Sequence, residues 1–297
     1  MSKDIKYPSA KSHRFLHAAP QFRPIRRGAR RKGIEREYTS KDGLKKLTIY
    51  LFYELDIADQ DLLLCLIGML LPEEKGKIVN GESRKESSIK LRDDLELKGS
   101  VLSMNALKAE TTGYELLTEL NKGTGKANYL WLEKALRRLA LVQFEFNNNG
   151  AVSFFKLLSV SFLKNDKNVL EKIEYCINPY SASAVLGDSN GYVLQHRGER
   201  SQLKKEEARA LHSVLCGLVD MGAECVFNVD MLADKVYSRY DEEITADTLR
   251  RRRKNIISAC SEINLLSYWL CLVIGSGVNA ALKIKRKRRK DKKLSCL

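Results

Sequence analysis

The stretch from 248 to 263 most constrains the fold, because it combines a helical repeat of apolar residues with five consecutive cations. The apolar residues recur at steps of seven, four and three, and they are Leu249, Ile256, Cys260 and Ile263. That spacing predicts an amphipathic helix with one face in a core. The cations of Arg250–Lys254 crowd about one turn, where like charges repel. A polyanion would offset that repulsion, so we expect the polar face to meet a nucleic-acid groove.

Positions on this polar face differ in what they can contact. We expect four of them to reach base edges, because Arg can bond guanine bidentately and Asn can bond adenine: Arg250, Arg251, Lys254 and Asn255. Arg252 and Arg253 are expected to reach phosphates instead. The competing interpretation is a solvated charged face, which is the usual fate of a charge run. Five cations without an interleaved acid favour DNA contact.

The positive charge of the chain is concentrated at its two ends. The net charge is +15 over 297 residues, of which 44% are hydrophobic and 30% charged. Residues 1–36 hold 11 Lys or Arg against 2 acids, and residues 283–293 hold 9 against 1, so the remainder is about −2. Basic ends on a near-neutral globular body are typical of polyanion binding. This length predicts two domains, each able to bury its own core.

Cysteine and histidine patterns give no metal or disulfide signal. The seven cysteines include no Cys-x-x-Cys pair, and the four histidines include no His-x-His pair. We therefore expect reduced cysteines in a cytoplasmic protein, with no metal and no other cofactor. The apolar runs 62–71 and 265–275 are too short to span a bilayer, and the N-terminus has no apolar signal segment, so no membrane partner is expected.

A weak internal repeat appears, with a spacing of roughly 120 to 145 residues. In the first copy, helices are expected at 59–71, 111–120 and 126–139, with a strand near 89–97. A hairpin should follow, formed by 142–146 and 152–162 around the turn at 147–150.

In the second copy, the predicted helices are 203–219, 229–237 and 245–263, and the predicted hairpin is 266–274 with 280–284. This order of helix, helix, basic helix and hairpin is typical of a winged helix-turn-helix, whose third helix enters the major groove. We therefore predict an α+β fold with two tandem winged helix-turn-helix domains and basic N- and C-terminal extensions. The expected parts are an arm at 1–37, domains at 38–178 and 179–284, and a tail at 285–297.

Two further basic segments are candidates for DNA contact. The third helix of the first copy carries polar residues largely on one side, namely Lys126, Asn128, Lys134, Arg137 and Arg138. Glu133 weakens this patch, and a solvated face is an equal alternative. In the N-terminal arm, phosphate coating is the favoured role of Arg26, Arg27, Arg30, Arg31 and Lys32, ahead of minor-groove entry.

Enzymatic interpretations find little support in the sequence. The run 122–127 imitates a phosphate loop, but Leu120 stands where its first Gly should be and Ala127 replaces the final Ser or Thr. No His pair beside a tyrosine and no carboxylate pair in a suitable context suggests DNA cleavage. We therefore expect no catalytic residues and a protein that is not an enzyme.

Eight stretches carry a resemblance to a known family, and they occur in the family's order. They are 22–32 (FRPIRRGARRK), 58–61 (ADQD), 113–117 (GYELL), 155–159 (FKLLS), 177–179 (INP), 184–187 (AVLG), 210–217 (ALHSVLCG) and 248–253 (TLRRRR). Together they resemble the iteron-binding replication initiators of IncQ-type broad-host-range plasmids, the RepC family. The basic tail after residue 283 has no counterpart in it.

This resemblance implies two winged-helix domains, binding to repeated origin sites on double-stranded DNA, and origin opening with a plasmid helicase and primase or host replication proteins. A monomer and a dimer both remain open. The alternatives are a winged-helix transcriptional repressor and, with less support, a DNA-nicking replication enzyme.

Overall fold

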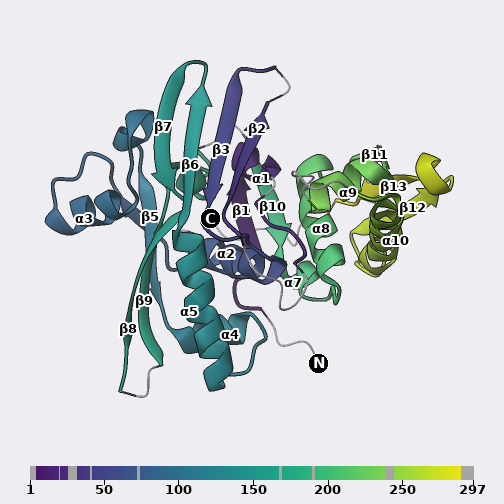
Figure 1. Cartoon of the computed structure of the whole chain (residues 1–297). Helices are drawn as coiled ribbons and strands as arrows, with labels where there is room; N and C mark the ends of the chain where they lie inside the picture. The colour runs from purple at the N-terminus through teal and green to yellow at the C-terminus, as the bar shows by residue number, and fades with distance from the viewer. Residues whose placement is uncertain are drawn as a thin grey trace. The chain divides into compact units, whose positions relative to one another are not determined.

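The computed structural model describes residues 5–19, 21–25, 32–40, 42–71, 74–166, 169–188, 191–237 and 244–288. The chain divides into two compact units, residues 1–198 and 199–297. Helices and antiparallel sheets are mixed in both units, so the fold is of the mixed α and β kind (Figure 1). Among the described residues, no helix has the length and apolarity that crossing a bilayer requires.

Unit 1 contains three antiparallel sheets. The first has the order β2-β3-β6-β7, formed by Ile34–Thr39, Lys45–Leu51, Val142–Asn148 and Ala151–Lys156. The second has the order β4-β5-β9-β8, formed by Lys77–Val79, Ala106–Thr111, Leu170–Ile177 and Leu158–Lys164. The third pairs β1, Ser9–His13, with β10, Tyr192–His196. Within this unit, Figure 1 shows the β6–β7 and β8–β9 hairpins extending in opposite directions.

The helices of unit 1 are α1 Arg14–Ala18, α2 Ile57–Met69, α3 Glu86–Asp94, α4 Gly113–Glu119, α5 Lys126–Ala140 and α6 Pro179–Leu186. A 3-10 turn, η1, spans Gly99–Ser103. Helix α2 is central: every residue from Leu62 to Met69 is buried, because β1, α4 and α5 all pack against it. Its start is fixed by a capping box, in which Asp56 and Asp59 accept each other's backbone N–H.

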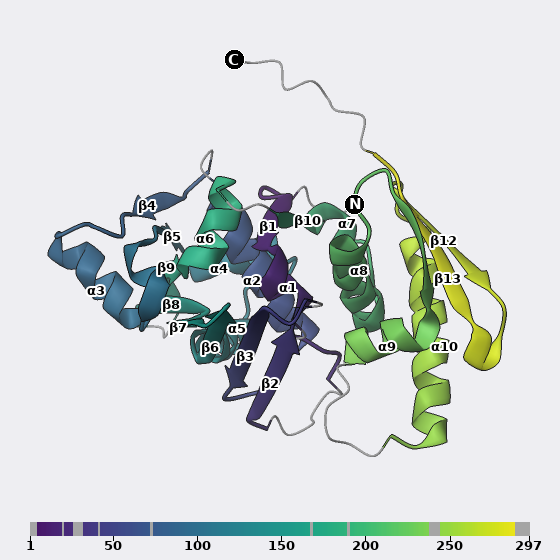
Figure 2. The ribbon, with the colours of Figure 1, turned by 90° about the horizontal axis from the view of Figure 1, so that it is seen from above.

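Unit 2 is smaller and contains three main helices and one sheet. After α7, Arg197–Arg200, come α8 Glu206–Leu218, α9 Val229–Tyr237 and α10 Ala246–Ile263. The sheet has the order β11-β13-β12, formed by Glu224–Asn228, Ala281–Arg286 and Trp269–Ile274. A 3-10 turn, η2 at Gly277–Asn279, lies between β12 and β13. In Figure 2, α10 lies between α8 and the β12–β13 hairpin.

The structure confirms most helices expected from periodicity and corrects two strands. The segment 89–97, expected as a strand, is largely helix α3. The side chain of Arg92, in α3, is buried and donates to the backbone carbonyls of Leu102 and Met104. The helical spacing of α3 allows this contact. The single strand expected at 152–162 is two strands, β7 and β8, in different sheets. They separate at Leu157, whose N–H donates to Val142 and whose side chain is buried.

The boundary between the units lies later than the one expected after residue 178. Residues 179–198 belong to unit 1, because α6 packs against β1 and β5, and β10 pairs with β1. Parts of the expected N-terminal arm also belong to this body, since it contributes β1, α1 and most of β2. Residues 285 and 286 of the expected tail complete β13, and the tail from residue 289 lies outside the described residues.

Candidate nucleic-acid interface

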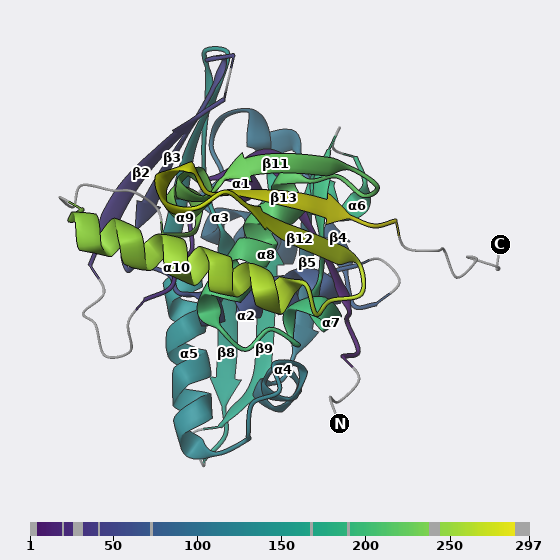
Figure 3. The same cartoon turned by 90° about the vertical axis from the view of Figure 1, so that its right-hand side faces the viewer.

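Helix α10 is positioned by a cap at its start and by one buried face. The Thr245 hydroxyl accepts the N–H of Thr248 at 3.3 Å, which satisfies one of the open donors of the first turn. Ile256, Ala259, Cys260 and Ile263 are buried against the rest of unit 2. The apolar spacing of the sequence therefore determines which side of α10 faces outward, and Figure 3 shows the helix running along the surface of its unit.

Three cations of this helix lie on the solvent side. Arg251 and Lys254 are exposed, and within the described chain they form no hydrogen bond or ion pair. Arg250 is also exposed, and its NH1 group lies 3.0 Å from Asp247 Oδ1. Both partners of that pair are largely in water, at 79% and 88% exposed, so the pair contributes little and leaves Arg250 available to another anion.

The other polar residues of α10 contact α9, including Tyr237 at its C-terminal end. Arg253 makes two bonds to Asp230, from Nε at 2.5 Å and from NH2 at 2.7 Å. The guanidinium of Arg252 lies 4.9 Å from the centre of the Tyr237 ring. Asn255 Nδ2 donates to the Tyr237 hydroxyl at 2.9 Å. Burial raises the pKa of Tyr237 to about 12, so its hydroxyl stays protonated at neutral pH. These three residues orient α10 against α9.

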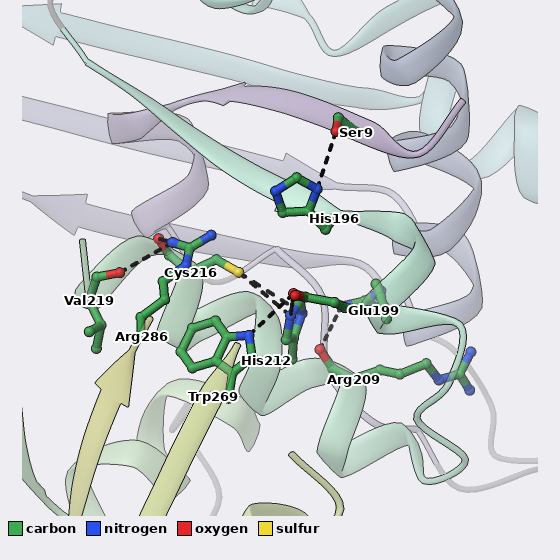
Figure 4. Close-up of polar contacts among 10 residues, drawn as sticks. Ser9, His196, Glu199, Arg209, His212, Cys216, Val219, Trp269 and Arg286 are labelled. Atoms are coloured by element: carbon green, nitrogen blue, oxygen red, sulfur yellow. Dashed lines mark hydrogen bonds and ion pairs between the residues drawn. The ribbon is translucent and has the colours of Figure 1, made fainter. Parts of the chain in front are cut away.

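A buried polar cluster beneath the sheet joins α8 to β12 and β13 (Figure 4). Glu199 Oε2 accepts from Trp269 Nε1 at 3.2 Å and lies 3.3 Å from His212 Nε2. Burial alone would lower the pKa of His212, but Cys216 and Glu199 outweigh it and raise the pKa to about 9. Arg286 donates to the carbonyls of Cys216 and Val219, each at 3.2 Å. The cluster fixes the hairpin relative to the helices of this unit.

The β12–β13 hairpin follows α10. Hydrogen bonds hold its base, and its turn contains glycines. Asn264 follows α10, and its side chain accepts from the Cys271 N–H at 2.5 Å and donates to the Cys271 carbonyl at 2.6 Å. Gly275 and Gly277 adopt φ values of 72° and 59°, in the left-handed region that favours glycine. Lys283 on β13 pairs with Glu224 of β11 at 2.8 Å.

The polar residues of α5, the second predicted contact helix, have different surroundings. Lys126 and Lys134 are exposed, and they form no ion pair or hydrogen bond within the described part of the chain. Asn128 Nδ2 donates to the Gly123 carbonyl at 2.7 Å, which closes the preceding turn. Arg137 pairs with Glu133 at 3.0 Å and stays largely exposed.

Arg138 points inward, and its position was not apparent from the sequence. It makes two bonds to Asp59 of α2, at 3.1 and 2.6 Å, and Asp59 is fully buried. Its guanidinium therefore holds α5 to α2, and of the predicted α5 residues only Lys126, Lys134 and Arg137 present exposed cations.

For the arm, the predicted residues Arg26, Arg27, Arg30 and Arg31 lie outside the described residues. Lys32 is described and exposed, and its carbonyl accepts the N–H of Glu54 at 3.0 Å. Arg23, before the arginine run, forms an ion pair with the Glu54 carboxylate. Both flanks of the run are thus attached to the same residue of unit 1.

Sequence reasoning missed two features of unit 2. Asp230 is 23 positions before its partner Arg253, and no sequence signal joins them. Lys283 and Lys285 alternate with Leu282 and Ile284 on β13, a signal that could have placed both lysines on the solvent face. Among the described residues there is no group of side chains suited to a metal ion. Burial raises the pKa of Cys65 and Cys176 to about 12, so these thiols are unreactive.

Comparison with solved structures finds two that share the fold of this chain and a third that is less similar. Crystal structures of RctB domains 2 and 3 match with a TM-score of 0.56 at 12% identity, covering 93% of this chain and 97% of that chain. A selenomethionine form of the same two domains gives 0.53 at 11% identity, covering 93% and 99%. The Pi initiator protein in complex with iteron DNA gives only 0.45 at 13% identity, covering 62% and 82%.

By sequence, the chain matches a family model but no individual curated protein. The family model described as Replication protein C (RepC) matches residues 9–285, which cover most of both units, helix α10 and nearly all of the hairpin beside it. A match over that span shows that the chain belongs to the Replication protein C (RepC) family.

Proposed function

We propose that this protein is a plasmid replication initiator that binds repeated origin sequences, or iterons, on double-stranded DNA. The observation that carries the proposal is the outward face of α10, where Arg250, Arg251 and Lys254 are exposed on a helix of a RepC-family chain. Guanidinium groups on such a face can bond guanine edges in the major groove and phosphates beside it.

The proposed recognition unit is a winged helix-turn-helix in unit 2. Its elements follow in the required order, with α8 and α9 as the supporting pair, α10 as the recognition helix and β12–β13 as the wing. In unit 1 the helices α2, α4 and α5 and the hairpin β6–β7 have the same order, with helix α3, the turn η1 and further strands inserted or added. We propose that unit 1 is a second winged-helix domain with a weaker DNA surface at Lys126, Lys134 and Arg137.

We further propose that the protein acts in the cytoplasm without covalent chemistry and without a cofactor. Binding at several adjacent iterons would bend the duplex, and the stored strain would favour unstacking of a neighbouring A·T-rich segment. A plasmid helicase and primase, or host replication proteins, would then load on the opened strands.

Footprinting on the origin of the plasmid that encodes the chain tests this function. We expect several regularly spaced protected sites of one sequence. A single protected palindrome over a promoter would instead identify a transcriptional repressor and contradict initiation.

A nicking assay tests the absence of covalent chemistry. Supercoiled origin plasmid incubated with the protein and Mg²⁺ should stay supercoiled after deproteinisation. Accumulation of nicked circles that depends on the protein would show a DNA-nicking enzyme and overturn this part of the proposal.

A further inference from the structure

Strand β12 has the sequence of a strand that is covered on both faces. Its six residues, Trp269–Ile274, are all apolar, whereas a strand with one solvent face alternates apolar and polar residues. The neighbouring strand β13 shows the normal alternation, with Leu282 and Ile284 inward and Lys283 and Lys285 outward. The apolar run in β12 therefore predicts that both faces of this strand are covered, whereas a sheet that packs on one side covers only one face.

The described chain covers the inner face of this strand at Trp269 and Cys271, whereas Val273, near its end, is 47% exposed. Trp269 and Cys271 point toward the helices and are 2% exposed. Leu270, Leu272 and Ile274 point the other way, and they are 39%, 49% and 47% exposed. Helix α10 packs against the inner side of β12, so the exposed leucines and isoleucine lie on the side of the sheet that faces away from α10.

Cross-strand register extends this exposed stripe into a surface, which we call the outer sheet face. It comprises Leu270, Leu272, Ile274, Val226, Lys283, Lys285 and Glu224, and the exposed pair of Glu224 with Lys283 at 2.8 Å leaves the face with a net positive charge. Lys283 lies between Leu272 on one neighbouring strand and Val226, 60% exposed, on the other. Lys285 is exposed beside Leu270 and forms no ion pair within the described chain. The outer sheet face thus combines an apolar stripe with lysines directly beside it.

The free edge of β12 is partly closed to strand addition. The N–H and carbonyl of Cys271 point outward at the middle of the strand, and the Asn264 side chain bonds both of them. An added strand would have to displace these two hydrogen bonds. A ligand can reach the apolar stripe from its face without disturbing them, so face docking is favoured over β-augmentation.

We propose that the outer sheet face docks an acidic amphipathic segment of another protein. Leucine or similar side chains of that segment would cover the stripe, and its carboxylates would meet Lys283 and Lys285. Exposed apolar surface of this extent, bordered by charge, marks protein interaction sites. A second copy of this chain is disfavoured, because each face carries two lysines against the single carboxylate of Glu224, and stacking two faces would bring together two net positive charges. The face is opposite the side packed on α10, so DNA on α10 leaves it open.

A designed peptide provides a defined probe. It is a fluorescent amphipathic helix about five turns long, with leucines on one side and glutamates on the other, and it is titrated into the full-length protein by anisotropy. We expect saturable binding that Leu272→Ser or Ile274→Ser weakens at least about tenfold. The matched control is Leu163→Ser, which replaces a leucine of β8 that is 66% exposed in unit 1 and should bind like wild type.

Charge exchange sharpens the test. Lys285→Glu should weaken binding of the glutamate peptide and strengthen binding of the same peptide with lysine in place of glutamate. Saturating duplex DNA should leave peptide binding unchanged. Circular dichroism and thermal unfolding of each variant confirm that it is folded, so a loss of binding reports on the face itself.

Four outcomes would overturn the proposal. They are absence of saturable peptide binding to the wild type, equal binding by the face variants, and competition by duplex DNA, which would make the face a DNA contact. The fourth is a dimer in light scattering that Leu272→Ser converts to a monomer, which would make a second copy the occupant.

Discussion

At the scale of single residues, four of the five cations of α10 fall into three different environments. Arg251 and Lys254 are exposed and form no pair within the described chain, whereas Arg253 is held by two bonds to Asp230 and Arg252 stacks on Tyr237. The run is uniform in sequence, but its residues lie on different sides of the helix. Some are therefore free to bind a ligand, and others orient the helix against α9. The proposed base contacts fall to the first kind.

Replacing Arg251 tests this division. Arg251→Ala should weaken binding to the iteron by about 1–3 kcal/mol and relax the base preference at one position. Binding constants for specific and random duplexes measure both effects. Arg84→Ala is the matched control, because Arg84 is also exposed but lies in unit 1, before α3. An equal loss on specific and random DNA would show that Arg251 contacts only the backbone.

His13, at the end of β1, makes stability depend on pH. Burial lowers its pKa from 6.5 to about 4, and Lys45 adds to the effect. The folded chain therefore keeps His13 neutral in a range where the unfolded chain binds a proton. The stability that this group contributes is present above pH 6.5 and is lost as the pH falls from 6.5 toward 4.

A variant isolates this contribution. Between pH 7 and pH 4.5, the free energy of unfolding should fall in both proteins. In His13→Phe it should fall by on the order of 1–2 kcal/mol less than in wild type. Urea unfolding of both proteins at the two pH values measures it, and carboxylate titration cancels in the comparison. Equal losses of unfolding free energy in the two proteins would contradict this prediction, because they would show that His13 binds a proton equally well in the folded and the unfolded chain.

At the scale of elements, one ion pair joins two helices that lie far apart in the sequence. Asp59 serves the capping box of α2 and also accepts two bonds from Arg138 of α5. The carboxylate is fully buried, so removing Arg138 would take away its ion-pair partner and leave a buried charge compensated only in part. The pair therefore couples the start of α2 to the packing of α5.

Arg138→Ala should accordingly lower the free energy of unfolding of unit 1 by about 3–5 kcal/mol. Arg137→Ala is the control in the next position, and it should cost less than about 1 kcal/mol because Arg137 is 61% exposed. Urea unfolding of the full-length variants measures both. Similar effects of the two substitutions would contradict the inward role of Arg138.

At the scale of the whole molecule, positive charge at both ends should make DNA binding strongly dependent on salt. With roughly 6–10 phosphate contacts, affinity should fall at least about a thousandfold between 50 and 200 mM salt. Replacing Arg30 and Arg31 together by Ala should weaken specific and random DNA alike and make the slope of log K against log salt shallower by about two. An unchanged slope would exclude these arginines from phosphate contact.

Fold and candidate site were predictable from the sequence where the signal is local. The amphipathic spacing of 126–139 and 245–263 predicts α5 and α10 and their buried sides, because both depend on residues within a few turns. Strand pairing of distant segments was not predictable. No local pattern shows that β1 pairs with β10 or that β2 and β3 extend the β6–β7 hairpin, so the sequence alone could not assign residues 179–198 to unit 1.

By itself, then, the sequence determined the helices, the charge distribution and the family, since each is written in neighbouring residues or in their order along the chain. Only the tertiary structure decided which cations are free and which are bound, because Asp230 and Asp59 come near Arg253 and Arg138 only after the helices pack. It also decided that only Trp269 and Cys271 of the apolar run in β12 are buried. Burial and ion pairing depend on partners distant in sequence, and folding brings them together.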